Sequence, residues 1–80
     1  MKTRMPELRK SRKVSQEELA IAVGVSRQTI TSIEVGKFNP SLPLAHRISL
    51  YFDMPIDEIF DLSEFVLPQR ENKAAEQSIR

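Results

Sequence analysis

The segment from Ser15 to Gly36 contains two helix start signals and two glycines, and their spacing leaves room for only two short helices. Ser15 and Glu18 have the spacing of a capping box, in which the serine and the glutamate satisfy free N–H groups at a helix N-terminus. Gly24 stands where a left-handed residue would end this helix. Ser26 offers a second N-cap almost at once, and Gly36 ends the helix that follows. The pattern predicts two helices joined by a tight turn.

Apolar residues at helical spacing predict further helices on both sides of this pair. Pro6 and Pro43 each fall in the first turn of a predicted helix, where a missing N–H is tolerated. Pro55 begins a last short helix, and Asp57 and Glu58 are favourable near its N-terminus. The fold class that we expect is all-α, a compact five-helix bundle. The predicted helices cover residues 5–13, 16–23, 26–35, 41–52 and 55–60.

The composition excludes several kinds of site. The chain has no Cys and a single His, so a disulfide or a thiolate metal site is excluded, and we expect no metal and no cofactor. No apolar run approaches the roughly 20 residues of a membrane span, and the N-terminus lacks the apolar stretch of a signal peptide. We therefore expect a soluble cytoplasmic protein. The sequence has neither a Gly-rich phosphate loop nor a Cys–His pair, so we do not expect an enzyme.

The net charge of +1 conceals an uneven distribution along the chain. Residues 1–14 contain six Lys and Arg against one Glu, whereas residues 53–65 contain five acidic residues and no Lys or Arg. One end of the molecule is therefore expected to face phosphate while the other end faces away from it. An ordinary surface of mixed charge is the alternative.

Several short motifs occur in a fixed order along the chain. They are Leu8-Arg9, Val14 to Ala20, Val23 to Ser26, Ile30, Ile33-Glu34, Gly36-Lys37, Asn39 to Ser41 and Ile56 to Phe60. Together they resemble the phage repressor and Cro type of helix-turn-helix domain, also called the XRE-like family. The resemblance extends over about two-thirds of the chain. It implies that residues 1–67 form the DNA-binding domain of a prokaryotic or phage transcriptional regulator, including a dimerisation segment.

The resemblance also implies how such a domain reads DNA. The family binds double-stranded DNA as a two-fold dimer on a pseudo-palindromic operator, with half-sites about 34–36 Å apart. The second helix of the pair would lie in the major groove, where Arg suits guanine and Gln suits adenine as bidentate partners. The residues implied to face base edges are Arg27, Gln28 and Ser32, with Thr31 a weaker candidate. The alternative is that Arg27 and Gln28 are ordinary surface residues.

Phosphate contacts are implied at the N-termini of the two helices and in the loop that follows them. Helix N-termini attract anions, and such contacts set the register without reading sequence. The candidates are Gln16, Ser26, Thr29, Lys37 and Asn39. In similar domains the positions of Arg9 and Glu34 pair across the first and third helices, so both are assigned to structure. Ala20 must be small because the next helix crosses close to it.

Residues 62–67 alternate weakly between apolar and polar and are predicted to form a short strand. Exposed on a monomer, their apolar side chains would form an unusual apolar edge, so we expect the strand to pair with its two-fold mate. The residues expected at this dimer interface are Leu62, Phe65, Val66 and Leu67. A strand folded back on its own domain is the alternative.

The last part of the chain, residues 68–80, is polar and is predicted to be a disordered tail. This tail leaves a second function open, which is the antitoxin of a toxin–antitoxin pair. In that case the tail would fold on a toxin as its protein partner, while the helix-turn-helix represses the operon. Co-purification of a stable partner would distinguish this function from that of a stand-alone repressor.

Overall fold

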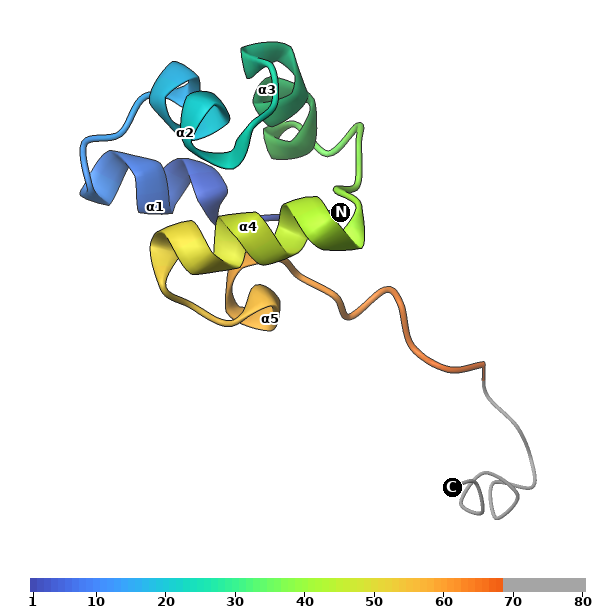
Figure 1. The fold of residues 1–80 in the computed structure, drawn as a ribbon. Helices are drawn as coiled ribbons and strands as arrows, with labels where there is room; N and C mark the ends of the chain where they lie inside the picture. The colour runs from blue at the N-terminus through green and yellow to red at the C-terminus, as the bar shows by residue number, and fades with distance from the viewer. Residues whose placement is uncertain (69–80) are drawn as a thin grey trace.

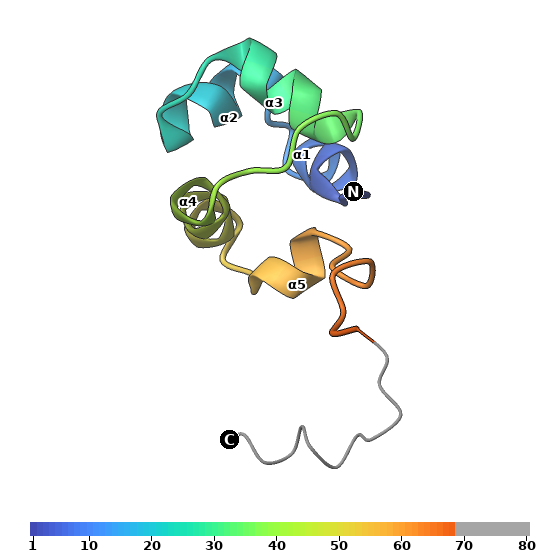
Figure 2. The same cartoon turned by 90° about the vertical axis from the view of Figure 1, so that its right-hand side faces the viewer.

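The structure is a computed structural model, and it describes residues 1–68. Its helices are α1 Met5–Ser11, α2 Gln16–Val23, α3 Arg27–Glu34, α4 Leu42–Phe52 and α5 Ile56–Ile59. Figure 1 shows α2 and α3 above α4 and α5 below it. Figure 2, in which α4 is seen almost end-on, shows the same order. The predicted all-α fold with five helices is confirmed.

Serine side chains cap the helices as the sequence predicts. Ser15 Oγ accepts from the Glu18 N–H at 2.9 Å, and Glu18 Oε1 accepts from the Ser15 N–H at 2.8 Å, which completes the capping box. Ser26 Oγ accepts from the Thr29 N–H at 3.2 Å. Ser41 Oγ caps α4 in the same way. Each cap satisfies an N–H group that has no partner inside its own helix.

Left-handed residues end the first two helices. Gly24, the C-cap of α2, has φ +79°, a conformation that glycine adopts without strain. The next N–H, that of Val25, donates to Ala20 O at 3.0 Å, and the chain then turns into α3. Lys13 has φ +57°, which a right-handed helix excludes. Helix α1 therefore ends at Ser11, earlier than the sequence predicted.

The core is built from apolar side chains of all five helices. Helix α3 contributes only Ile30 and Ile33, so most of its surface lies outside the core. Ala20 is buried on α2, and α2 is the helix that packs most extensively on α3. This agrees with the expectation that Ala20 is small because the next helix crosses close to it. The buried residues are Met5, Leu8, Leu19, Ala20, Val23, Ile30, Ile33, Leu44, Ala45, Ile48, Phe52, Ile59 and Phe60.

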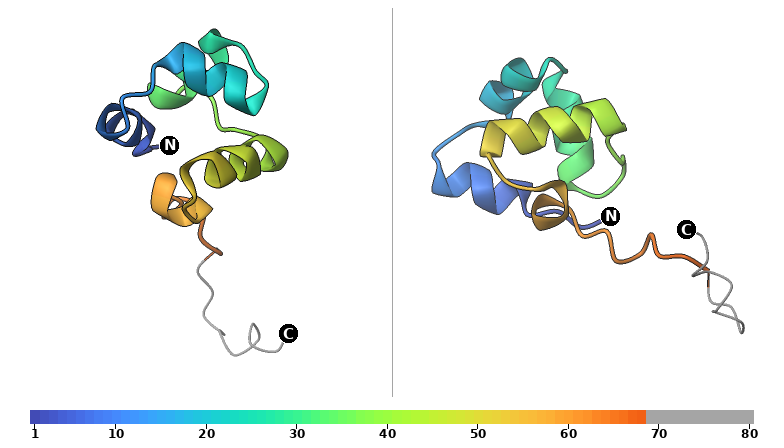
Figure 3. Two further views of the ribbon diagram at one scale, coloured as in Figure 1. Left: turned by 60° about the vertical axis from the view of Figure 1, so that its left-hand side comes forward. Right: turned by 60° about the horizontal axis from the view of Figure 1, so that its bottom comes forward.

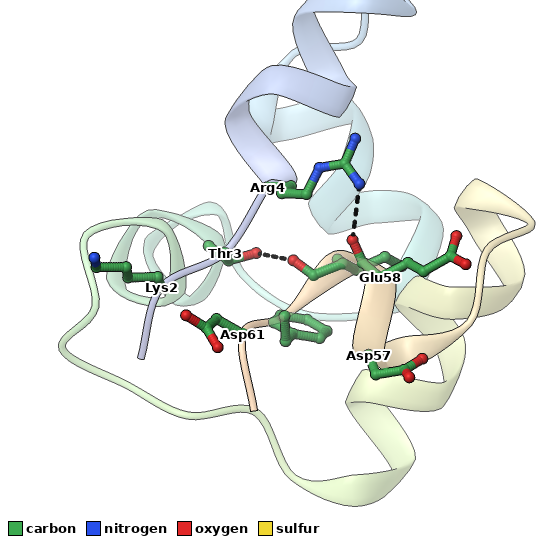
Figure 4. Close-up of a pocket in the computed structure, with 8 residues that line it drawn as sticks. Lys2, Thr3, Arg4, Asp57, Glu58 and Asp61 are labelled. Atoms are coloured by element: carbon green, nitrogen blue, oxygen red, sulfur yellow. Dashed lines mark hydrogen bonds between the residues drawn. The ribbon is translucent and has the colours of Figure 1, made fainter. Parts of the chain in front are cut away.

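The N-terminal segment runs beside α5 and ties it to the remaining helices (Figure 4). The Arg4 N–H and Thr3 Oγ1 both donate to Ile59 O, at 2.8 and 3.0 Å. Arg4 Nη1 donates to Glu58 O at 3.2 Å. Thr3 and Phe60 form an isolated antiparallel bridge, the only β pairing in the part of the chain that the structure describes. A helix as short as α5 is marginal by itself, so these bonds to its last carbonyls stabilise it.

The strand predicted over residues 62–67 does not form in the single chain. The Phe65 N–H donates to Leu62 O at 2.9 Å and closes a turn. Asp61 Oδ1 accepts from the hydroxyl and the N–H of Ser63, at 2.6 and 3.0 Å, and these bonds lower the pKa of Asp61. Figure 3 shows the segment leaving the helices in both views. Its apolar residues Leu62, Phe65, Val66 and Leu67 are exposed. Within residues 1–68 no strand lies beside the segment to form a ladder, so the strand depends on the second chain of the predicted pairing.

Pairing of residues 62–67 across a two-fold axis involves a second chain and stays a prediction. The alternative, a strand folded back on its own domain, does not occur in residues 1–68. The predicted polar tail, residues 68–80, lies outside the described residues except for Pro68.

Replacing Ala20 with Leu is expected to destabilise the fold. Ala20 is only 1% exposed, and extra methylene groups in a packed core force neighbouring side chains apart. We expect the free energy of unfolding in urea to fall by about 1–3 kcal/mol. Ala22→Leu is the matched control, because Ala22 is exposed on the same helix and its replacement should change stability by less than about 0.5 kcal/mol. Equal effects of the two substitutions would contradict the assigned packing of Ala20.

Candidate nucleic-acid interface

Helix α3 lies at the edge of the helical body (Figure 1). Apart from Ile30 and Ile33, all of its residues are polar or charged. Ile30 and Ile33 are its buried residues and hold it on the core. The residues predicted to face base edges make up much of the remaining surface of α3, with Arg27 and Gln28 exposed and Thr31 and Ser32 half-buried. The polar side chains at the start of the helix are therefore exposed to solvent.

A buried ion pair connects the C-terminal end of α3 to α1. Arg9 Nε donates to Glu34 Oε2 at 2.6 Å, and Arg9 Nη2 donates to Glu34 Oε1 at 2.9 Å. Only 12% of the Arg9 side chain and 5% of the Glu34 side chain are exposed. The hydrogen bond to the Glu34 carboxylate raises the pKa of Arg9, because it favours the charged guanidinium. Two parallel bonds set a direction as well as a distance, so the pair orients α3 relative to α1.

The side chain of Gln16, predicted to contact phosphate, lies inside a hydrogen-bond network of the protein. Gln16 Nε2 donates to Glu34 Oε1 at 3.0 Å. Gln16 Oε1 accepts from Thr31 Oγ1 at 3.1 Å and, over a longer distance of 3.5 Å, from Arg27 Nε. One amide therefore joins the buried ion pair to two of the residues predicted to face bases. This role of Gln16 was not predicted from the sequence, since Gln16 lies on a different helix from Arg27, Thr31 and Glu34.

The other predicted phosphate contacts lie at the N-terminus of α3 and in the loop after it. Ser26 Oγ and Thr29 Oγ1 are 3.0 Å apart, so the two hydroxyls share a hydrogen bond beside the first turn. Lys37 and Asn39 are exposed in the loop. The Lys37 N–H donates to Ser32 O at 3.0 Å, which holds the beginning of the loop against α3. These residues border the exposed surface of α3 on two sides.

Phe38 is a residue that the sequence analysis did not assign to the interface. It follows Lys37 in the loop, and its N–H donates to Ser32 O at 3.2 Å. Its side chain is 46% exposed and borders a hollow beside α3. An exposed aromatic residue among polar ones is a signal that could have been read from the sequence Gly36-Lys37-Phe38-Asn39.

The expectation that the basic and acidic ends of the chain lie apart is wrong for Lys2 and Arg4. Both line a hollow of about 430 Å³ together with Asp57, Glu58 and Asp61, and Figure 4 shows these side chains around it. The N-terminal segment pairs with the C-terminal end of α5, so opposite charges that are distant in sequence become neighbours. This part of the surface is mixed in charge.

Two kinds of feature are absent from residues 1–68. None of the helices is both long and apolar enough to cross a bilayer. No three side chains of His, Cys, Asp and Glu gather where they would hold a metal ion.

Two capped helices around a left-handed glycine, with the second helix presenting a polar outer surface, define a helix-turn-helix DNA-binding domain. The helix-turn-helix family model matches residues 7–59 of this chain. The protein belongs to this family, and the resemblance to the phage repressor and Cro type is confirmed.

Proteins named as transcriptional regulators share much of this sequence. An HTH-type transcriptional regulator of Archaeoglobus fulgidus is 48% identical over 64 residues, which cover 80% of this chain and 90% of the relative. The activator BcrR of Enterococcus faecalis is 33% identical over 72 residues, or 89% of this chain and 35% of BcrR. The cryptic phage CTXphi repressor RstR of Vibrio cholerae is 31% identical over 62 residues, or 78% of this chain and 56% of RstR. The chain is thus a helix-turn-helix transcriptional regulator.

A double-mutant cycle should show that Arg9 and Glu34 act as a unit. Arg9→Met leaves the buried Glu34 carboxylate without its cation and is expected to lower the free energy of unfolding by about 3–5 kcal/mol. Arg9→Met combined with Glu34→Leu should cost much less than the sum of the two single substitutions, because no uncompensated charge remains buried.

The exposed ion pair between Arg4 and Glu7 serves as the control for this cycle. Its side chains are 53% and 67% exposed, so the coupling between Arg4→Ala and Glu7→Ala should be about 0–1 kcal/mol in urea unfolding. If the Arg9 and Glu34 substitutions are as nearly additive as this control, the buried pair does not have the role assigned to it.

Proposed function

We propose that the protein is a sequence-specific transcriptional repressor that binds a pseudo-palindromic operator as a homodimer, with α3 in the major groove. The observation that carries the proposal is the anchoring of α3. Ile30 and Ile33 hold it on the core, the Arg9–Glu34 pair holds its C-terminal end, and its polar surface stays free. A helix held in this way can enter a groove without losing its own packing.

Base reading is assigned to Arg27, Gln28 and Ser32, with Thr31 in a lesser role. Gln16 Oε1 accepts from Arg27 Nε, and this leaves both terminal nitrogens of the guanidinium for a guanine edge. Gln28 is exposed on the same turn, and its amide suits the N6 and N7 atoms of adenine. Thr31 has its hydroxyl bonded to Gln16 and is therefore less available.

Backbone contacts are assigned to the residues that border the surface of α3. The first turn of α3 and the loop after it offer polar groups that suit phosphate oxygens. The residues are Gln16, Ser26, Thr29, Lys37 and Asn39. For Gln16, whose side-chain amide is bonded within the protein, the backbone N–H at the start of α2 is the group that we assign to phosphate.

Dimerisation is assigned to residues 62–67, at the end of a domain formed by residues 1–67. A two-fold axis brings the same segment of two chains together, and each segment then gains the neighbouring strand that it lacks in one chain. The apolar side chains that the pairing would cover are Leu62, Phe65, Val66 and Leu67, all of them exposed in the single chain.

Repression is the simplest outcome for a domain of this kind, because occupancy of an operator is enough to exclude another protein from the same DNA. The similarity to the repressor RstR supports this assignment. The similarity to the activator BcrR, of which this chain matches only a third of the length, does not extend to the rest of that protein. Such a repressor would act in the cytoplasm of a prokaryote.

Selection of bound sequences from random duplexes tests the proposed function directly. We expect an inverted repeat whose half-sites lie about 34–36 Å apart, one turn of DNA. The selection is run at a salt concentration at which binding persists, so that phosphate contacts alone do not dominate. Enrichment of no motif would rule out sequence-specific binding, and enrichment of a single half-site would rule out the homodimer.

Substitution of the base-reading residues should change specificity and not only affinity. Arg27→Ala and Gln28→Ala are each expected to cost about 1–3 kcal/mol of binding and to relax preference at one base position per half-site. Lys37→Ala is the matched control, which should weaken binding to all sequences alike and reduce its salt dependence. If Arg27→Ala behaves like Lys37→Ala in titrations of variant duplexes, Arg27 contacts phosphate.

A further inference from the structure

We propose that Phe38 reads the C5-methyl group of a thymine at one position of each half-site, through the hollow that it shares with α3. The proposal rests on the proposed function and adds to it an apolar determinant of sequence preference. It assigns to the loop after α3 a part in base reading, where the residues of the loop were otherwise assigned to phosphate.

The backbone holds Phe38 in place although its side chain is exposed. Gly36 has φ +86°, a left-handed conformation that turns the chain just after α3. The N–H groups of Lys37 and Phe38 then both donate to Ser32 O, at 3.0 and 3.2 Å. Phe38 is 46% exposed, so an apolar residue remains in contact with water in the free protein at a position that the backbone defines.

The hollow beside Phe38 opens among residues assigned to DNA. It has a volume of about 230 Å³ and is lined by Phe38 together with Ser26, Gln28, Thr29 and Ser32. Phe38 is the one large apolar residue of this lining, and the other four residues are polar. A methyl group that enters this space can therefore gain apolar contact from Phe38.

The chemistry of the hollow suits a thymine edge. In the major groove only thymine presents a methyl group, and apolar side chains such as Phe recognise it. Gln28 lines the same hollow and suits adenine. Because thymine pairs with adenine, Gln28 can bind the adenine and Phe38 can contact the thymine methyl of the same base pair. The two bases can also belong to neighbouring pairs.

A phosphate contact does not explain the ring, since phenylalanine has no hydrogen-bond donor and no charge. Insertion of the ring between base steps is the other apolar role known for such side chains. That role depends on the ease of unstacking a step and not on a methyl group, so the test below separates it from methyl reading.

Replacement of thymine by uracil removes only the methyl group and is the sharpest test. Each thymine of the selected operator is replaced in turn, symmetrically in both half-sites, and binding of the full chain is titrated. The loss of one buried methyl group lowers affinity about fourfold. The symmetric replacement removes one methyl group from each half-site, so at the position that Phe38 reads it should weaken binding about sixteenfold. Phe38→Ala should bind the thymine and uracil duplexes equally at that position and keep its responses elsewhere.

Leu42→Ala is the matched control, because Leu42 is exposed on α4 and does not line the hollow. It should respond to uracil as the unaltered protein does. Far-ultraviolet circular dichroism checks that Phe38→Ala remains folded, as expected for an exposed side chain. An operator whose thymines all tolerate uracil, or a uracil response that Phe38→Ala retains at every position, overturns the proposal. These two results leave the proposed function standing, because both are obtained on an operator that the protein selects. A selection that enriches no motif overturns the proposed function itself, so the two failures are distinct.

Discussion

The orientation of α3 depends on the buried ion pair between Arg9 and Glu34. Ile30 and Ile33 are the only side chains that this helix contributes to the buried core. The bidentate bond adds a directional contact at the end of the helix. Removing two charges from water offsets much of their attraction, so the main contribution of the pair is geometric rather than energetic.

Gln16 extends this constraint to the polar surface of α3. Its amide donates to Glu34 and accepts from Thr31 and Arg27, so a chain of hydrogen bonds runs from the core to an exposed guanidinium. A side chain held near its binding conformation loses less rotamer freedom when it meets a ligand. The same few atoms therefore connect the packing of the fold to the residues assigned to reading.

The sequence was sufficient for features that act over a few residues. The serine caps, the left-handed Gly24 and the further helices with apolar residues at helical spacing were all predicted, because a cap or such a spacing depends on residues within one or two helical turns. The resemblance to a known family gave the position of the Arg9–Glu34 pair, which local patterns alone do not contain. The strand over residues 62–67 stays a prediction, because alternation describes a face and does not supply the neighbouring strand, which here would come from a second chain.

The helices, their caps and the family to which the protein belongs can be inferred from the order of residues alone. Three contacts cannot be inferred in this way: Gln16 bonds to α3, Thr3 bridges Phe60, and Phe38 borders a hollow with Gln28 and Ser32. The physical reason is the same in each case. These contacts join side chains or backbone groups of different elements, and their distances exist only once the core has set the positions of those elements.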